Sequence, residues 1–127
     1  MTELQNTLPL PAALETEKRL LSAVLNDPAA AQDLFEALHP KDFAGARSRQ
    51  IASVIHEALQ NDEPVDLPSL VDRLRMAGQL EACGGATWLA SLRDGVPVST
   101  HIEGGIQHVR EAASRRRMIP EIQKALQ

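Results

Sequence analysis

Apolar residues recur at a helical spacing along most of the chain, and no segment shows the strict alternation that is typical of a β-strand. The most regular stretch lies between Ser48 and Gln60, where an i, i+4 stripe is formed by Ile51, Val54, Ile55, Ala58 and Leu59. A stripe with this period places its side chains on one face of a helix. The pattern therefore predicts an all-α fold.

Proline, glycine and Asn/Asp clusters divide the chain before residue 100 into five short helices. We expect these helices between Pro11 and Asn26, Pro28 and Leu38, Ser48 and Gln60, Asp66 and Gly78, and Gly85 and Gly95. Asp66 is expected to be the N-cap of the fourth helix, and Gly78 to cap its C-terminus. The five helices form a globular head, residues 11–99, which follows a flexible leader, residues 1–10.

Residues 100–127 are predicted to form one long helix that leaves the head. Thr100 to Glu103 fits a capping box, and the 27 residues from His101 onward would span about 40 Å, which exceeds the width of so small a domain. Pro120 removes a backbone donor, so we expect a kink or break there. The apolar stripe of this helix begins with Ile102, Ile106, Val109 and Ala113 and restarts in another phase at Ile119, Ile122 and Leu126.

A helix that extends beyond its head has no surface of its own chain to cover an apolar stripe, so another chain must cover it. The candidate partner interface consists of Ile102, Ile106, Val109, Ala113, Arg116 and Ile119. The run Arg115-Arg116-Arg117 leaves three uses open, because it could contact DNA phosphates, an acidic partner surface or solvent. Its members cover about 300° of the helix, so they cannot all face one partner.

Charge and composition narrow the class of protein. The net charge is −4, with eight Lys/Arg against 14 Asp/Glu in residues 1–99 and five against three in residues 100–127. A dedicated DNA binder usually has a strongly basic face, so DNA contact is expected to be weak or indirect. No apolar run of about 18 residues exists and no secretory signal is present, so no membrane contact is expected. The single Cys83 suits a reducing cytoplasm.

Catalytic and metal-binding patterns are absent from the sequence. It has no Gly-x-x-x-x-Gly-Lys-[Ser/Thr] loop and no Cys/His spacing of a zinc site, so we expect no catalytic, cofactor-binding or metal-binding residue in this chain. Glu15 and Glu17 are interpreted as early-turn carboxylates that interact with the dipole of their own helix rather than as a catalytic pair. Trp88 is interpreted as a core anchor and Cys83 as a small packed side chain.

The order of short motifs resembles the N-terminal domain of the DnaB family of bacterial replicative helicases, over about residues 9 to 126. The motifs are Pro11-Ala-Ala-Leu-Glu15-Thr-Glu17, Asp42-Phe43, Pro64-Val65-Asp66-Leu67, Gly78-Gln79-Leu80, Gly84-Gly85-x-x-Trp88-Leu89, Val96-Pro97 and Val109-Arg110-Glu111 with Arg116. The chain departs from the family pattern at Ala44 and Gly105, where aromatic residues are usual, and at Ser48, near which histidine is common. It is therefore similar to a diverged member, of bacterial or phage origin.

This resemblance implies a non-catalytic collar domain with a role in DNA replication. In the family, such a domain precedes a linker and a RecA-like motor, so ATP and Mg²⁺ are expected only in the motor of an ATP-dependent 5'-3' DNA helicase. The long helix would be the first arm of a helical hairpin that pairs two copies, giving a hexamer as a trimer of dimers. The implied further partners are a DnaG-type primase and a helicase loader. The alternatives are a stand-alone protein that mimics this domain and, less favoured, a small helical DNA-binding regulator.

Overall fold

A computed structural model describes residues 11–94 and 102–126, and within them the side chains of residues 13–94 and 102–118. These residues contain six α-helices and one short 3-10 helix, without any strand, so the predicted all-α class is confirmed. The elements are α2 (Pro11–Asn26), α3 (Ala29–Ala37), η1 (Pro40–Asp42), α4 (Ala46–Gln60), α5 (Leu67–Met76), α6 (Gly85–Asp94) and α7 (Glu103–Leu126). The predicted leader and the Thr100 half of the capping box lie outside the described residues.

The ends of α5 show why the sequence breaks where it does. Asp66 precedes the helix with an extended backbone, and its Oδ1 accepts a hydrogen bond of 2.8 Å from the backbone N–H of Ser69. After Ala77, Gly78 has a φ of 71°, a left-handed conformation that glycine adopts at low cost. Both predicted caps of this helix are therefore confirmed.

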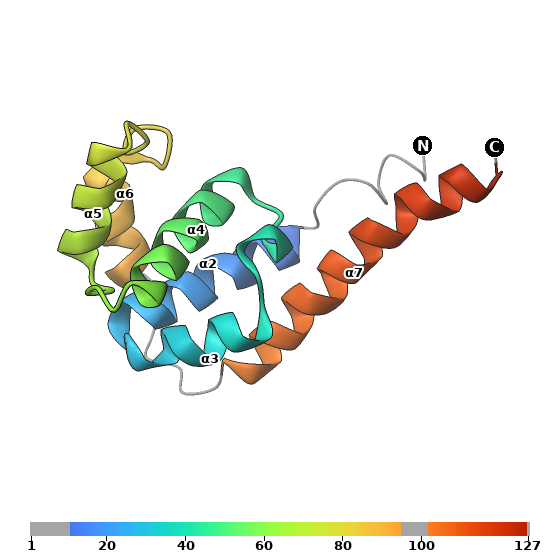
Figure 1. The fold of residues 1–127 in the computed structure, drawn as a ribbon, viewed down its shortest axis with the longest axis horizontal. Coiled ribbons are helices and arrows are strands. Elements are labelled where there is room, and N and C mark those ends of the chain that lie inside the picture. The colour runs from blue at the N-terminus through green and yellow to red at the C-terminus, as the bar shows by residue number, and fades with distance from the viewer. Residues whose placement is uncertain (1–10, 95–101, 127) are drawn as a thin grey trace.

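Helix α2 lies at the centre of the molecule and contacts α3, α4, α6 and α7 (Figure 1). Its buried residues join one apolar core with side chains from the other five α-helices. The largest fully buried apolar side chains of this core are Leu21, Val24, Leu34, Phe43, Ile51, Leu74, Leu89 and Val109. Phe43 follows η1 and is fully buried, so it fills the core from a loop. The described part of the chain is thus organised around α2.

The first half of α7 packs along α2 instead of standing clear of the head (Figure 1). Ile106, Val109 and Ala113 are only 8%, 0% and 2% exposed, so their stripe is covered within the chain. Gly105 permits this close approach, because a Cβ atom there would lie 2.9 Å from Cδ2 of Leu20 on α2. The expectation that the head cannot reach this stripe is therefore wrong. The predicted break at Pro120 is not seen either, since α7 is continuous to Leu126.

Candidate partner interface

A buried carboxylate connects α2 to the start of α4. Glu17 is fully buried, and its two oxygens accept hydrogen bonds from the backbone N–H groups of Ala44 at 2.8 Å and Gly45 at 3.0 Å. Gly45 is the N-cap residue of α4, so the negative charge lies at the positive end of that helix. Glu15 instead lies at the surface, where it binds Lys18 at 3.2 Å. The interpretation that Glu17 serves the dipole of its own helix is wrong, because it serves another helix.

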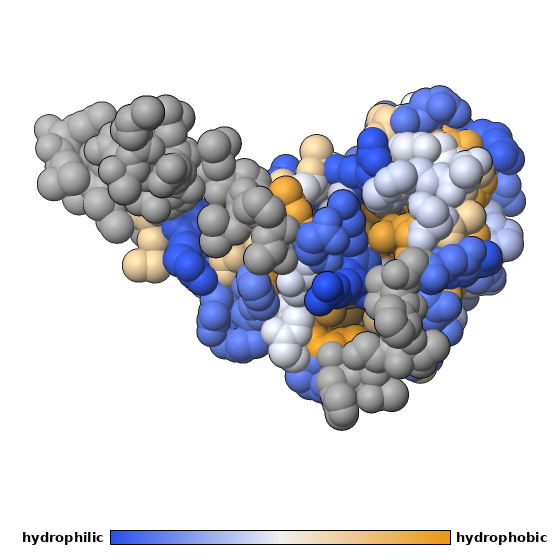
Figure 2. All heavy atoms as spheres, turned by 180° about the vertical axis from the view of Figure 1, so that it is seen from behind, coloured by the Kyte–Doolittle hydropathy of each residue, from blue (hydrophilic) through white to orange (hydrophobic). Residues whose placement is uncertain are grey.

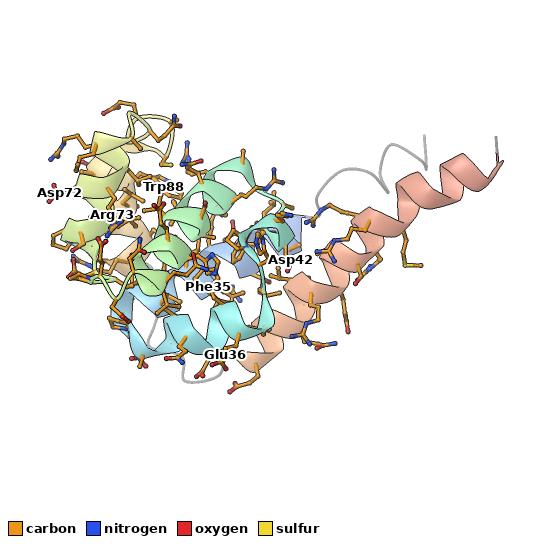
Figure 3. All side chains as sticks on the ribbon, in the orientation of Figure 1. Phe35, Glu36, Asp42, Asp72, Arg73 and Trp88 are labelled. Atoms are coloured by element: carbon orange, nitrogen blue, oxygen red, sulfur yellow. The ribbon has the colours of Figure 1, made fainter. Side chains whose placement is uncertain are left out.

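Asp42 joins η1 to the second half of α7 (Figure 3). Its Oδ2 accepts a hydrogen bond of 2.9 Å from the backbone N–H of His39, which closes the capping box of η1. Its Oδ1 forms an ion pair with Arg117, and its backbone carbonyl accepts a hydrogen bond of 2.9 Å from Nη2 of Arg116. A third arginine of α7, Arg110, donates to the carbonyl of Ala37 at the end of α3 at 3.1 Å.

These bonds bear on the three uses that the sequence leaves open for Arg115, Arg116 and Arg117. Arg116 and Arg117 hydrogen-bond to Asp42 within the chain, and Arg115 is exposed. Contact with DNA phosphates or with a partner would need guanidinium groups that are not already bound. For two of the three arginines, the described contacts are intramolecular instead. The sequence pattern around these arginines does not indicate their bonds to Asp42, because Asp42 lies about 75 residues away along the chain.

The six residues of the predicted interface lie in different environments. Ile106, Val109 and Ala113 are buried against the head, so they form core rather than a free stripe. The other three are Ile102, which is half-buried against the core, Arg116, which is bonded to Asp42, and Ile119, whose side chain lies outside the described residues. An interface through Ile119 stays a prediction.

Two exposed methionines are the surface apolar residues that the sequence analysis did not single out. Met118 on α7 is 55% exposed and Met76 on α5 is 88% exposed. On the face in Figure 2, other apolar side chains gather in small patches that are separated by polar ones. Met118 directly precedes the point where the apolar pattern of α7 restarts, and this restart is the signal that could have identified it.

Trp88 and Cys83 lie at the turn that leads into α6. Trp88 is half-buried against the core, with Cζ of Arg47 4.4 Å from its ring centroid, so it anchors the core only in part (Figure 3). Gly84 has a φ of 97°, and a Cβ atom there would come within 2.8 Å of the Trp88 side chain. Cys83 is buried, as predicted, and this burial raises the pKa of its thiol. A buried, neutral thiol is chemically quiet.

The described residues offer no other chemistry of note. No group of three or more His, Cys, Asp or Glu side chains in them could hold a metal ion. Within the same residues, no helix is both long enough and apolar enough to cross a membrane.

Comparison with known proteins agrees with this arrangement. The family model described as "DnaB-like helicase N terminal domain" matches residues 9–111. "Replicative DNA helicase DnaB" of Geobacillus stearothermophilus is 35% identical over 119 residues, which are 94% of this chain and 26% of that protein. "Replicative DNA helicase DnaC" of Bacillus subtilis (strain 168) is 31% identical, with the same shares covered. The chain thus spans about a quarter of the length of these relatives.

A solved structure of a related domain has the same fold as this chain. The crystal structure of the N-terminal domain of DnaB helicase from Mycobacterium tuberculosis matches with a TM-score of 0.82 and 26% sequence identity, covering 93% of this chain and 84% of that one. The family match covers well over half of the chain and includes the motifs built around Glu17, Asp42 and Trp88. The chain therefore belongs to the family of DnaB-like helicase N-terminal domains.

Proposed function

We propose that this domain is a non-catalytic assembly module of a replicative helicase, which pairs with a second copy of itself through the distal half of α7. One observation carries the proposal. Helix α7 continues to Leu126, nine residues past Arg117, its last described contact with the head, and exposes Met118 there (Figure 1). Nine helical residues extend about 14 Å. A projecting, partly apolar helix of this length is suited to pair with another chain.

The dimensions of this surface determine the expected strength of pairing. A stable protein interface buries about 800 Å² on each partner, roughly 20–30 residues a side. The distal part of α7 offers far fewer residues, so the domain alone should form a weak dimer. Pairing two identical helices gives a two-fold contact, the commonest closed symmetry. In a longer helicase, three such dimers would build a hexameric collar.

Sedimentation equilibrium tests self-association through this surface. We expect Met118→Glu to shift the protein to monomer, because it places a charge in the apolar contact. Met76→Glu is the matched control, since it makes the same change at an exposed methionine on α5 and should leave the dimer intact. Ile106→Glu should instead destabilise the head, because Ile106 is core. A wild-type chain that stays monomeric at hundreds of micromolar, or a Met118→Glu dimer as strong as wild type, refutes the proposal.

Membership in the family supports two further parts of the proposal. The collar would recruit a DnaG-type primase, with a loader as a second partner, and ATP-driven unwinding would belong to a motor domain that these residues do not contain. Titration calorimetry with a DnaG-type primase from the same source should show binding, whereas titration with ATP and Mg²⁺ should show none. Absence of primase binding to a self-associating chain would limit the function to assembly.

A further inference from the structure

The arginines of α7 attach this helix to the head at a second place, away from its contact with α2. Near its start, Gly105, Ile106 and Val109 pack on α2. Further along, two of its arginines bind the single residue Asp42. The α2 contact and the bond from Arg110 to Ala37 hold the first half of α7, and the bonds to Asp42 are the last described ones before the helix leaves the head. They are therefore placed to set the direction of the distal half of α7.

The ion pair at Asp42 is placed to control direction more than stability. The Arg117 side chain is 64% exposed, and an ion pair with one solvent-exposed member contributes little to the free energy of unfolding. The Asp42 side chain, in contrast, is only 11% exposed and is held by its bond from the His39 N–H. A nearly buried carboxylate therefore meets an exposed guanidinium just before α7 leaves the head.

We infer that Asp42, together with Arg116 and Arg117, forms a latch that fixes the direction in which the distal half of α7 leaves the head. With the latch closed, two copies meet with the distal halves of their α7 helices already aligned. With the latch open, α7 is held only by its contact with α2 and by the bond from Arg110 to Ala37, so its distal half takes more than one direction and pairing must first order it. The effect on pairing rests on the proposed self-association, whereas the effect on direction does not.

Two substitutions, each made in an Arg116→Gln background, open the latch from opposite sides, because neither alone removes the bond from Arg116 to the backbone carbonyl of Asp42. Asp42→Asn keeps an oxygen for the His39 N–H but loses the charge that binds Arg117. Arg117→Gln removes the guanidinium and leaves η1 untouched. Arg115→Gln, in the same background, is the matched control, because it removes the same charge from the same helix at an exposed position with no described partner.

Pulsed electron spin resonance on the full chain measures the direction of the distal half of α7 as a distance between two spin labels. Spin labels are placed at Met76→Cys on α5 and Gln123→Cys near the end of α7, in a Cys83→Ala background, with an excess of unlabelled chain so that only distances within one molecule are recorded. We expect a narrow distance distribution in the parent and in Arg115→Gln. In Asp42→Asn and Arg117→Gln, we expect at least a twofold broader distribution with the melting temperature almost unchanged.

The outcomes separate the latch from the proposed function. Distributions in Asp42→Asn and Arg117→Gln as narrow as in the parent overturn the latch. If Asp42→Asn fails to fold, the exposed Arg117→Gln decides the matter alone. Sedimentation of the same variants should then show a dimer weakened about fivefold or more relative to Arg115→Gln. A parent that never dimerises refutes the proposed function, while the distance measurement still judges the latch.

Discussion

Gly104 and Gly105 begin α7 side by side, and the same change to alanine should have different effects at the two positions. A Cβ atom at Gly104 would meet nothing within 4 Å. Alanine is favoured over glycine in a helix by up to about 1 kcal/mol, so Gly104→Ala should stabilise the protein by that amount or less. The first turn of a helix gains least, which makes this an upper value.

Gly105→Ala gains the same helix propensity but must also fit against α2. Its Cβ atom would lie 2.9 Å from Cδ2 of Leu20 and 3.4 Å from Cγ2 of Thr16. Leu20 is buried, so its side chain has little room to rotate away, and overpacking of this kind costs about 1–3 kcal/mol. The net effect should range from nearly neutral to about 2 kcal/mol of destabilisation. The difference between the two variants isolates the packing cost, about 1–3 kcal/mol.

Urea unfolding followed by far-UV circular dichroism measures both free energies. A second pair of variants tests the cause: in a Leu20→Ala background, Gly105→Ala should become stabilising, because the added methyl group then fills space instead of colliding. If the free energies of unfolding of Gly104→Ala and Gly105→Ala agree within about 0.5 kcal/mol, Gly105 does not pack closely on Leu20 and the argument is refuted.

The buried groups of the head give three further predictions. Glu17→Ala leaves two buried N–H donors without an acceptor and should cost about 3 kcal/mol in urea unfolding, whereas Glu15→Ala at the surface should change stability by less than about 0.5 kcal/mol. Phe43→Ala should cost about 3–5 kcal/mol by the same assay, and Trp88→Ala less, because Trp88 is only half-buried. The Cys83 thiol should react with Ellman's reagent only when the protein unfolds. Because burial raises the pKa of this thiol in the folded protein, the free energy of unfolding should fall as the pH rises past the ordinary thiol range, and Cys83→Ala should reduce this fall.

The helices and several of their ends could be predicted because they depend on neighbours in sequence. The caps at Asp66 and Gly78 follow from local hydrogen bonding and backbone conformation, and the stripe through Ile51 and Ile55 follows from helix period. The break expected at Pro120 is the local exception. Loss of one donor is not sufficient to end α7, which is continuous through that position.

The long-range contacts could not be predicted in this way. Nothing in the sequence near Glu17 indicates that its acceptors serve Ala44 and Gly45, and nothing near Arg116 indicates Asp42. Both motifs contribute to the resemblance to the family, but a resemblance records that a carboxylate is present and not which donors it binds. Only the packing of α4 and α7 on α2, and of η1 against α4 and α7, brings these groups together.

The same limit applies to the apolar stripe of α7. An apolar stripe shows that something covers a helix, but its period does not say whether the cover belongs to the same chain. Here the stripe through Ile106 and Val109 is covered within the chain, and the pattern restarts in another phase at Ile119. A change of phase within one long helix therefore indicates a change of partner. On this argument, the proposed surface for a second copy begins at Met118, directly after the last described contact of α7 with the head.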